Sequence, residues 1–298
     1  MLGEQISMRG WVRWLALVAG VIALSACTMT RFGYEMLPWL TMWRIERYIP
    51  LNETQRKQVS RRLDELHQWH RTTQLPHYAA KLEQAGVQLA KPLASDQVVL
   101  WREDLLAFWQ PIADRLAPGL AELALTLQPG QIDRLARRLD REAGELRTDY
   151  APADLLARTE ARAKRWTERM ETLFGRLEPG QRSEIRSLAE RFPSDESSWI
   201  DERLARGRDF VSLLRRIEAE RPDQALAEQW ARDYLGGLFE SRDTERRARI
   251  AANNANGDRL TAMMINTATP VQREHMLKLI RGYQSDFVRL SGAQVVKR

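Results

Sequence analysis

Cysteine is almost absent from this sequence, which has one, Cys27, in 298 residues. A single thiol cannot close a disulfide within the chain, so the fold must be held by packing alone. Long apolar runs are also scarce. The longest, residues 14–24, supplies about half of the ~20 apolar residues that a membrane-spanning helix needs, and no second segment reaches that length.

Signatures of catalysis are missing as well. The chain has no glycine-rich phosphate loop and no Gly-x-Ser-x-Gly motif, and its carboxylates are spread along the sequence without a recognisable acid–base pair. We therefore predict that the protein is not an enzyme and needs no cofactor. Its 46 basic and 40 acidic residues are intermixed, which is typical of a solvated surface. We expect no nucleic-acid partner.

The sequence before Cys27 has the layout of a secretory signal peptide. Arg9 and Arg13 provide the charged part, and the apolar run follows them. The segment LSAC, residues 24–27, resembles the lipobox of bacterial lipoproteins. This resemblance implies cleavage just before Cys27 and attachment of a lipid to its thiol.

The lipobox divides the chain into two parts. Residues 1–26 are expected to be a lipoprotein signal peptide, and residues 27–298 a periplasmic body with room for a subdivision near residue 150. Thr28 in place of Asp after the cysteine resembles a sorting signal for the outer membrane. We expect a palmitoylated protein on the periplasmic face of that membrane, because two or three acyl chains, at ~0.8 kcal/mol per buried CH₂, form a stable anchor.

Apolar residues recur at helical spacing through most of this body, and the alternation typical of strands with Asn-Gly turns is absent. Residues 155–177 show the pattern best, with an apolar stripe at steps of three and four. The sequence predicts an all-α fold, an elongated bundle of about nine helices with no sheet. The expected helices are 34–48, 53–91 with a break near Pro76, 96–127 bent at Pro111 and Pro118, 129–149, 152–177, 179–192, 196–220, 223–266 and 270–290.

Four of the expected helices begin with one shared pattern, a residue that is Leu or Ala followed four places later by Gln. The four glutamines are Gln55, Gln131, Gln181 and Gln272. Each lies three residues past the expected cap, so its side chain can accept the free N–H of the cap residue, as in a capping box. Capping alone therefore explains the repeat. The unequal spacings argue against a solenoid.

Two stretches carry resemblances to known families. Residues 51–55, LNETQ, resemble the Leu-Thr-x-x-Gln element of the Spy-type periplasmic chaperones, which implies an unfolded polypeptide as client. The segments RFGY at 31–34 and WHRTTQLPHY at 69–78 resemble a family of proteobacterial envelope lipoproteins carrying a domain of unknown function. That resemblance extends over essentially the whole mature chain and supplies no catalytic residue.

A metal site is a minor alternative, carried by His67, His70 and His77. Imidazoles on one helix face bind zinc or copper. However, the spacing lacks the Glu of a His-Glu-x-x-His motif, and Pro76 disturbs the helix before His77. We expect these histidines to pack and form hydrogen bonds, with no metal bound.

Two further segments have more than one interpretation. Residues 34–49 are apolar on nearly every side, which favours a core helix over one lying on the membrane. Residues 240–259 interrupt the helical pattern with polar side chains. These side chains form either a solvated face or a groove for an anionic ligand or a partner. The candidate groove residues are Arg242, Arg246, Arg249, Asn253 and Asn256.

Three functional hypotheses follow from these patterns. The first is a non-catalytic binding or scaffold protein of envelope biogenesis, chaperone-like, with an envelope protein or unfolded polypeptide as partner. The second is a carrier or sensor of an anionic ligand, such as a lipid or a cell-wall fragment. The third is a metal-dependent enzyme using the histidines between residues 67 and 77.

Cys27→Ser tests the lipobox. Removing the thiol should release the protein from the membrane fraction or leave an uncleaved precursor, because the lipid acceptor is gone. Fractionation followed by intact-mass measurement reads this out. Wild type and variant that fractionate alike, with no acyl mass on either, would contradict lipidation.

Overall fold

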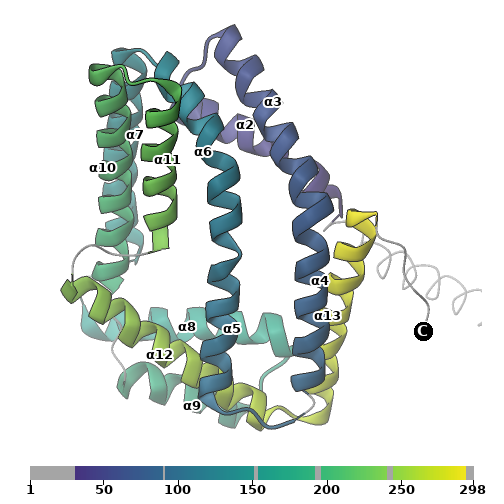
Figure 1. Ribbon diagram of the computed structural model, residues 1–298. Helices are drawn as coiled ribbons and strands as arrows, with labels where there is room; N and C mark the ends of the chain where they lie inside the picture. The colour runs from purple at the N-terminus through teal and green to yellow at the C-terminus, as the bar shows by residue number, and fades with distance from the viewer. Residues whose placement is uncertain (1–30, 90, 151–153, 192–195, 240–243, 293–298) are drawn as a thin grey trace, which may run out of the picture.

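The computed structural model describes residues 31–89, 91–150, 154–191, 196–239 and 244–292, and these ranges are helical, with no strand among them (Figure 1). The all-α prediction is confirmed. The helices are α2 (Leu37–Tyr48), α3 (Glu53–Trp69), α4 (Leu75–Gln88), α5 (Ser95–Ala107), α6 (Trp109–Thr126), α7 (Pro129–Tyr150), α8 (Leu155–Phe174), α9 (Pro179–Arg191), α10 (Glu196–Glu220), α11 (Gln224–Gly236), α12 (Thr244–Thr267) and α13 (Pro270–Ser291). Within the described ranges, no helix is long and apolar enough to cross a bilayer.

Three of the nine expected helices are each divided in two. The expected helix 53–91 has a π turn, η1 (His70–Gln74), where a break was predicted. Pro76 lacks an N–H, and its ring would collide with the carbonyl four residues back in a regular α-helix. In the wider turn the N–H of Leu75 donates to the carbonyl of His70 instead. The chain therefore stays helical from α3 through α4.

The other two divisions have different causes. The expected helix 96–127 is interrupted at Phe108, between α5 and α6, while α6 continues through Pro111 and Pro118. The expected helix 223–266 ends early, because Gly236 and Gly237 lead into a short 3₁₀ turn, η2 (Gly237–Phe239), before α12. Glycine is a common helix terminator, since its backbone keeps the most freedom outside the helix.

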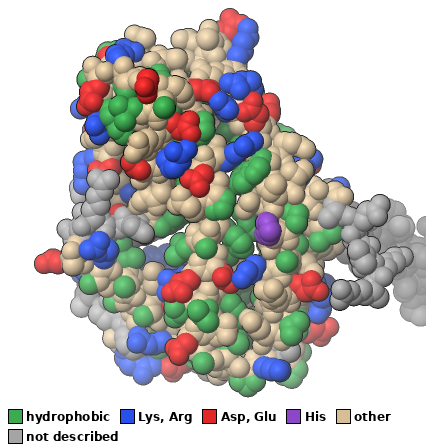
Figure 2. Space-filling model, in the orientation of Figure 1, with side chains coloured by type: hydrophobic (Ala, Val, Ile, Leu, Met, Phe, Trp, Pro, Cys, Tyr) green, Lys and Arg blue, Asp and Glu red, His purple; other side chains and the backbone are tan. Residues whose placement is uncertain are grey.

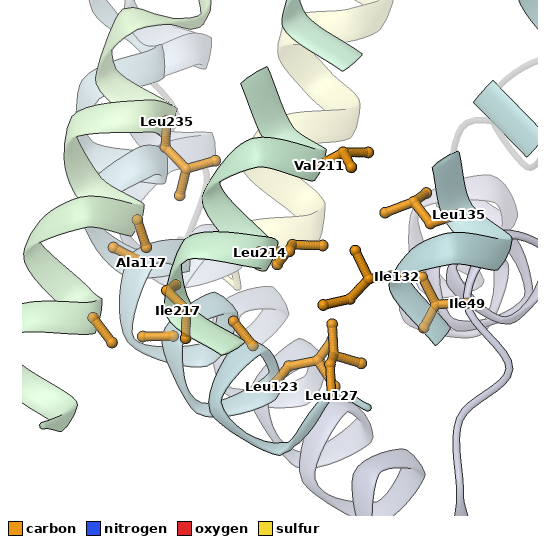
Figure 3. Close-up of a cluster of buried hydrophobic side chains, with 14 of the residues drawn as sticks. Ile49, Ala117, Leu123, Leu127, Ile132, Leu135, Val211, Leu214, Ile217 and Leu235 are labelled. Carbon is orange, nitrogen blue, oxygen red and sulfur yellow. The ribbon is translucent and has the colours of Figure 1, made fainter. Parts of the chain in front are cut away.

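Buried apolar side chains form two main clusters. The first core combines α3, α6 and α7 with α10 and α11, and its buried members include Ala117, Leu127, Ile132 and Leu214 (Figure 3). Alanines on α6 allow α11 to pack closely against it. The second core joins α8, α9, α12 and α13 around residues such as Ile185 and Met264, and Leu89 at the end of α4 and Trp101 of α5 also belong to it. Helices on both sides of residue 150 enter each core, and the subdivision near residue 150 stays a prediction.

Gln55 and Gln131 join two of the four helix starts by a reciprocal pair of amide hydrogen bonds. Each Oε1 accepts the N–H of its own cap residue, at 3.0 Å from Asn52 and 2.9 Å from Gln128, as predicted. Each Nε2 donates to the Oε1 of the other glutamine, at 3.3 and 2.9 Å. Each also donates to a backbone carbonyl before the other helix start, at Thr126 and Pro50.

Gln181 and Gln272 repeat this arrangement at the second core. Their Oε1 atoms accept the N–H groups of Glu178 and Thr269, and the two side-chain amides exchange hydrogen bonds of 2.9 and 2.8 Å. The remaining amide hydrogens reach the carbonyls of Thr267 and Arg176. Three of the four glutamines are buried and Gln131 is half-buried, so these bonds replace water for polar groups that burial would leave unsatisfied.

Gln55→Ala should lower the free energy of unfolding by about 2–4 kcal/mol, because it leaves several buried polar groups unsatisfied at ~1–3 kcal/mol each. Urea unfolding followed by far-ultraviolet circular dichroism measures this. Gln68→Ala is the matched control, an exposed glutamine on the same helix, and should change little.

A double-mutant cycle with Gln131→Ala tests the reciprocal pair itself. The double variant should lose less stability than the two single variants together, since the second substitution removes a bond that is already broken. Strict additivity would contradict the pairing.

Candidate functional site

Two adjoining apolar cavities lie beside the first core, with volumes of about 340 and 580 Å³. They share part of their walls and are together called here the α6 cavity. The shared residues come from α2, α6, α10 and α11, and are Ile45, Leu120, Leu123, Phe210 and Tyr234. A space of this size and character suits an apolar ligand of some length.

The charged residues that line the α6 cavity are all arginines. They are Arg44, Arg62, Arg115 and Arg206, and neither part of the lining contains Asp or Glu. Arg62 pairs with Glu122, and Arg206 donates to the carbonyl of Leu238 at 2.9 Å. By contrast, Arg44 and Arg115 form no ion pair with any residue that the structure describes. Both side chains are exposed; Arg44 donates to the Tyr48 hydroxyl at 3.3 Å, and the Arg115 guanidinium lies over the ring of Trp69.

The hydroxyl groups along this wall are neutral. Burial raises the pKa of Tyr234 to about 12, and its hydroxyl donates to the carbonyl of Arg206 at 3.2 Å. Burial, together with the nearby Glu142, also raises the pKa of Tyr48, whose hydroxyl donates to that carboxylate at 2.7 Å. Neither tyrosine therefore adds a negative charge to the lining, and the Glu142 carboxylate behind Tyr48 pairs with Arg138 at 3.1 Å.

Helix α2 covers one side of this cavity. Met42, Ile45 and Tyr48 pack against the first core, but no residue of α2 itself is buried. The expectation of a core helix at residues 34–49 is therefore wrong for α2, because only one of its sides has a packing partner. Trp39 and Trp43 face solvent on the other side.

His67 and His70 form hydrogen bonds with Tyr34. His67 Nε2 lies 3.1 Å from the Tyr34 carbonyl oxygen, and His70 Nδ1 lies 2.9 Å from the Tyr34 hydroxyl. His77, beyond the π turn, is exposed. Over the described ranges, no three His, Cys, Asp or Glu residues are arranged to hold a metal ion. The absence of bound metal stays a prediction for the purified protein.

The predicted polar groove at residues 242–256 lies on α12 and the segment before it. Arg242 falls outside the described residues, as does the side chain of Arg246. Arg249 forms a surface ion pair with Glu245 at 3.6 Å, and Asn256 accepts a hydrogen bond from Arg259. Asn253 is half-buried, and none of these residues lines the α6 cavity. Cys27 also lies outside the described residues.

No pattern in the sequence indicates the α6 cavity. Its walls carry Leu, Ile and Phe at helical spacing, which is the same pattern that predicts a filled core. Acidic and basic side chains are intermixed on the outer face shown in Figure 2, so charge clustering did not reveal the site either.

The structure defines an all-α protein with two pairs of joined helix starts and, beside its first core, an apolar cavity whose charged lining residues are arginines. Within that class, the chain belongs to DUF6279, a family of unknown function whose model matches residues 47–234. The matched region runs from the end of α2 into α11 and includes most of the cavity wall. No curated protein and no solved structure matches the chain.

His70 should make the protein less stable in mild acid. Burial, followed by the neighbouring His67, lowers the pKa of His70 from its ordinary 6.5. Folding therefore favours the neutral ring, and this stabilisation is lost as the pH falls below about 6.5, where the unfolded chain binds the proton first.

Urea unfolding of wild type and His70→Gln over this pH range measures the effect. The stability advantage of wild type should shrink as the pH falls. An advantage that stays constant with pH would contradict the assignment.

Proposed function

We propose that the protein is a lipid-anchored, non-catalytic binding protein of envelope biogenesis, attached through Cys27 to the periplasmic face of the outer membrane. Its ligand is an amphiphile, with an acyl chain in the α6 cavity and an anionic head group near Arg44 and Arg115. The observation that carries this proposal is the lining, which is apolar apart from arginines.

The chemistry of the lining supports this class of ligand. Burying a chain of CH₂ groups against leucine and phenylalanine is favourable by about 0.8 kcal/mol for each group. An anion beside two unpaired guanidinium groups forms charge-assisted hydrogen bonds, which are stronger than neutral ones. A zwitterionic or cationic head group would gain less, because no carboxylate lines the space.

The lipoprotein part of the proposal has separate support. It comes from the lipobox-like LSAC segment and from the single cysteine within it. The resemblance to proteobacterial lipoproteins agrees with membership of DUF6279 in that both point to a family of unknown function. The chaperone-like alternative rests on the Leu-x-x-x-Gln helix starts. The glutamine side chains of these starts form hydrogen bonds that join helices within the fold.

Photo-crosslinking with a diazirine-bearing fatty acid tests the ligand. On the purified lipoprotein, the label should map to peptides of α6, α10 and α11 that line the cavity, and excess phosphatidylglycerol should compete with it. Mass spectrometry of the digested protein reads out the labelled positions.

Gly207→Phe should abolish this labelling. Gly207 is a helical residue of the cavity wall, and a Cβ placed there would lie 3.5 Å from Leu139, in ordinary contact. No backbone atom outside its own helix lies within 4 Å of that Cβ, and we expect the ring to occupy the space that the acyl chain would take. Gly282→Phe is the matched control, a helical glycine with nothing within 4 Å of such a Cβ, and should keep the label.

Equal labelling of both variants would overturn the assignment of the cavity. If an unfolded polypeptide competes with the label and phospholipid does not, the ligand is a chaperone client and not an amphiphile.

A further inference from the structure

Exposed apolar side chains form a stripe along the outward side of α2 and the helical turn before it. Phe32 is 63% exposed, Trp39 59% and Trp43 50%. These residues and Met36 follow one another at steps of three and four, which places them on one side of the helix. The backbone bonds from Met36 to Phe32 and from Leu40 to Met36 keep this segment helical.

The acidic residues of this segment pair with arginines of the next two helical elements, α3 and η1. Glu35 pairs with Arg71, and Glu46 pairs with Arg56.

The basic residues of α2 remain unpaired. Arg44 and Arg47 are exposed and form no ion pair within the described ranges, and the Arg47 guanidinium lies over the ring of Trp43, 5.6 Å from its centroid. The outward side of α2 is therefore both apolar and cationic, and complements a surface that is apolar and anionic.

The α6 cavity opens beside this stripe. Leu40, Thr41 and Arg44 line the larger part of the cavity and are exposed at the same time. They therefore lie at its opening, on the flank of α2 next to the tryptophans.

The described chain begins close to the expected anchor. Arg31 follows Cys27 by four residues, which span at most ~14 Å when fully extended. A lipid on Cys27 would keep this helix near the bilayer. Tryptophan favours the bilayer interface, where its ring is buried and its N–H stays near water.

We propose that the outward side of α2, Phe32 to Arg47, rests on a leaflet containing anionic phospholipid, and that the cavity opening beside Leu40 and Arg44 receives its amphiphile from that leaflet. The docking itself stands on the stripe and its charge. The transfer of a ligand rests on the proposed function.

Tryptophan quenching by brominated lipid tests the docking. The lipoprotein is reconstituted into vesicles of phosphatidylcholine and phosphatidylglycerol with brominated acyl chains. Trp39→Phe combined with Trp43→Phe should remove most of the quenching, because these two rings reach the acyl region. Trp109→Phe combined with Trp230→Phe, in the first core, removes the same number of rings and should preserve it.

Charge dependence gives a second readout. Arg44→Gln combined with Arg47→Gln should weaken quenching in the mixed vesicles, and vesicles of phosphatidylcholine alone should weaken it for wild type. Arg134→Gln combined with Arg137→Gln, exposed arginines of α7, should have no such effect.

Quenching that is equal in both tryptophan variants would overturn the docking. If the protein's mass in analytical sedimentation falls only when Trp39 and Trp43 are replaced, the stripe binds a second copy of the chain. That result would also overturn the docking on the leaflet. Gly207→Phe separates the two proposals, since it should stop photo-labelling and leave quenching intact.

Discussion

The fold depends on glutamine side-chain amides that each form hydrogen bonds with two helix starts. A glutamine three residues past a helix cap can use its oxygen for its own helix start, and its nitrogen is then left buried with two hydrogens to donate. In both pairs those hydrogens reach the partner glutamine and the chain just before the partner helix. The polar ends of two helices are thereby satisfied together, and the apolar residues one turn further along are brought into the cores.

The sequence predicted the local part of this arrangement, which is the capping of each helix start by its own glutamine. The Leu-x-x-x-Gln spacing and the prolines at the first helical positions predicted where α7, α9 and α13 begin, because capping depends only on neighbouring residues. It could not indicate that Gln55 pairs with Gln131, since amides 76 residues apart carry no mark of their contact. The π turn was missed for a related reason. A proline predicts a disturbed helix, but whether the helix bends, ends or widens depends on what packs beside it.

The α6 cavity and α2 show why the candidate site was harder to foresee. A stripe of leucines has the same spacing whether its partner helix fills the space or leaves it open, so the pattern predicts contact and not volume. In α2 the apolar residues surround the helix, and only the fold determines which of them meet the first core. The arginines that line the cavity come from α2, α3, α6 and α10, and such convergence from distant segments leaves no signature in the sequence.

The four helix starts also pose a problem of pairing during folding. Four helix starts that carry the same glutamine can form two pairs in three different ways, as four cysteines can. The amide groups are chemically identical, so they do not favour one pairing over another. Gln131 is nearer in sequence to Gln181, 50 residues away, than to its native partner. The packing behind each pair resolves this, because the residue four places after each glutamine is buried in one particular core: Val59 and Leu135 in the first, Ile185 and Met276 in the second. A mismatched pair would satisfy the same amide groups but direct these apolar side chains toward the wrong core.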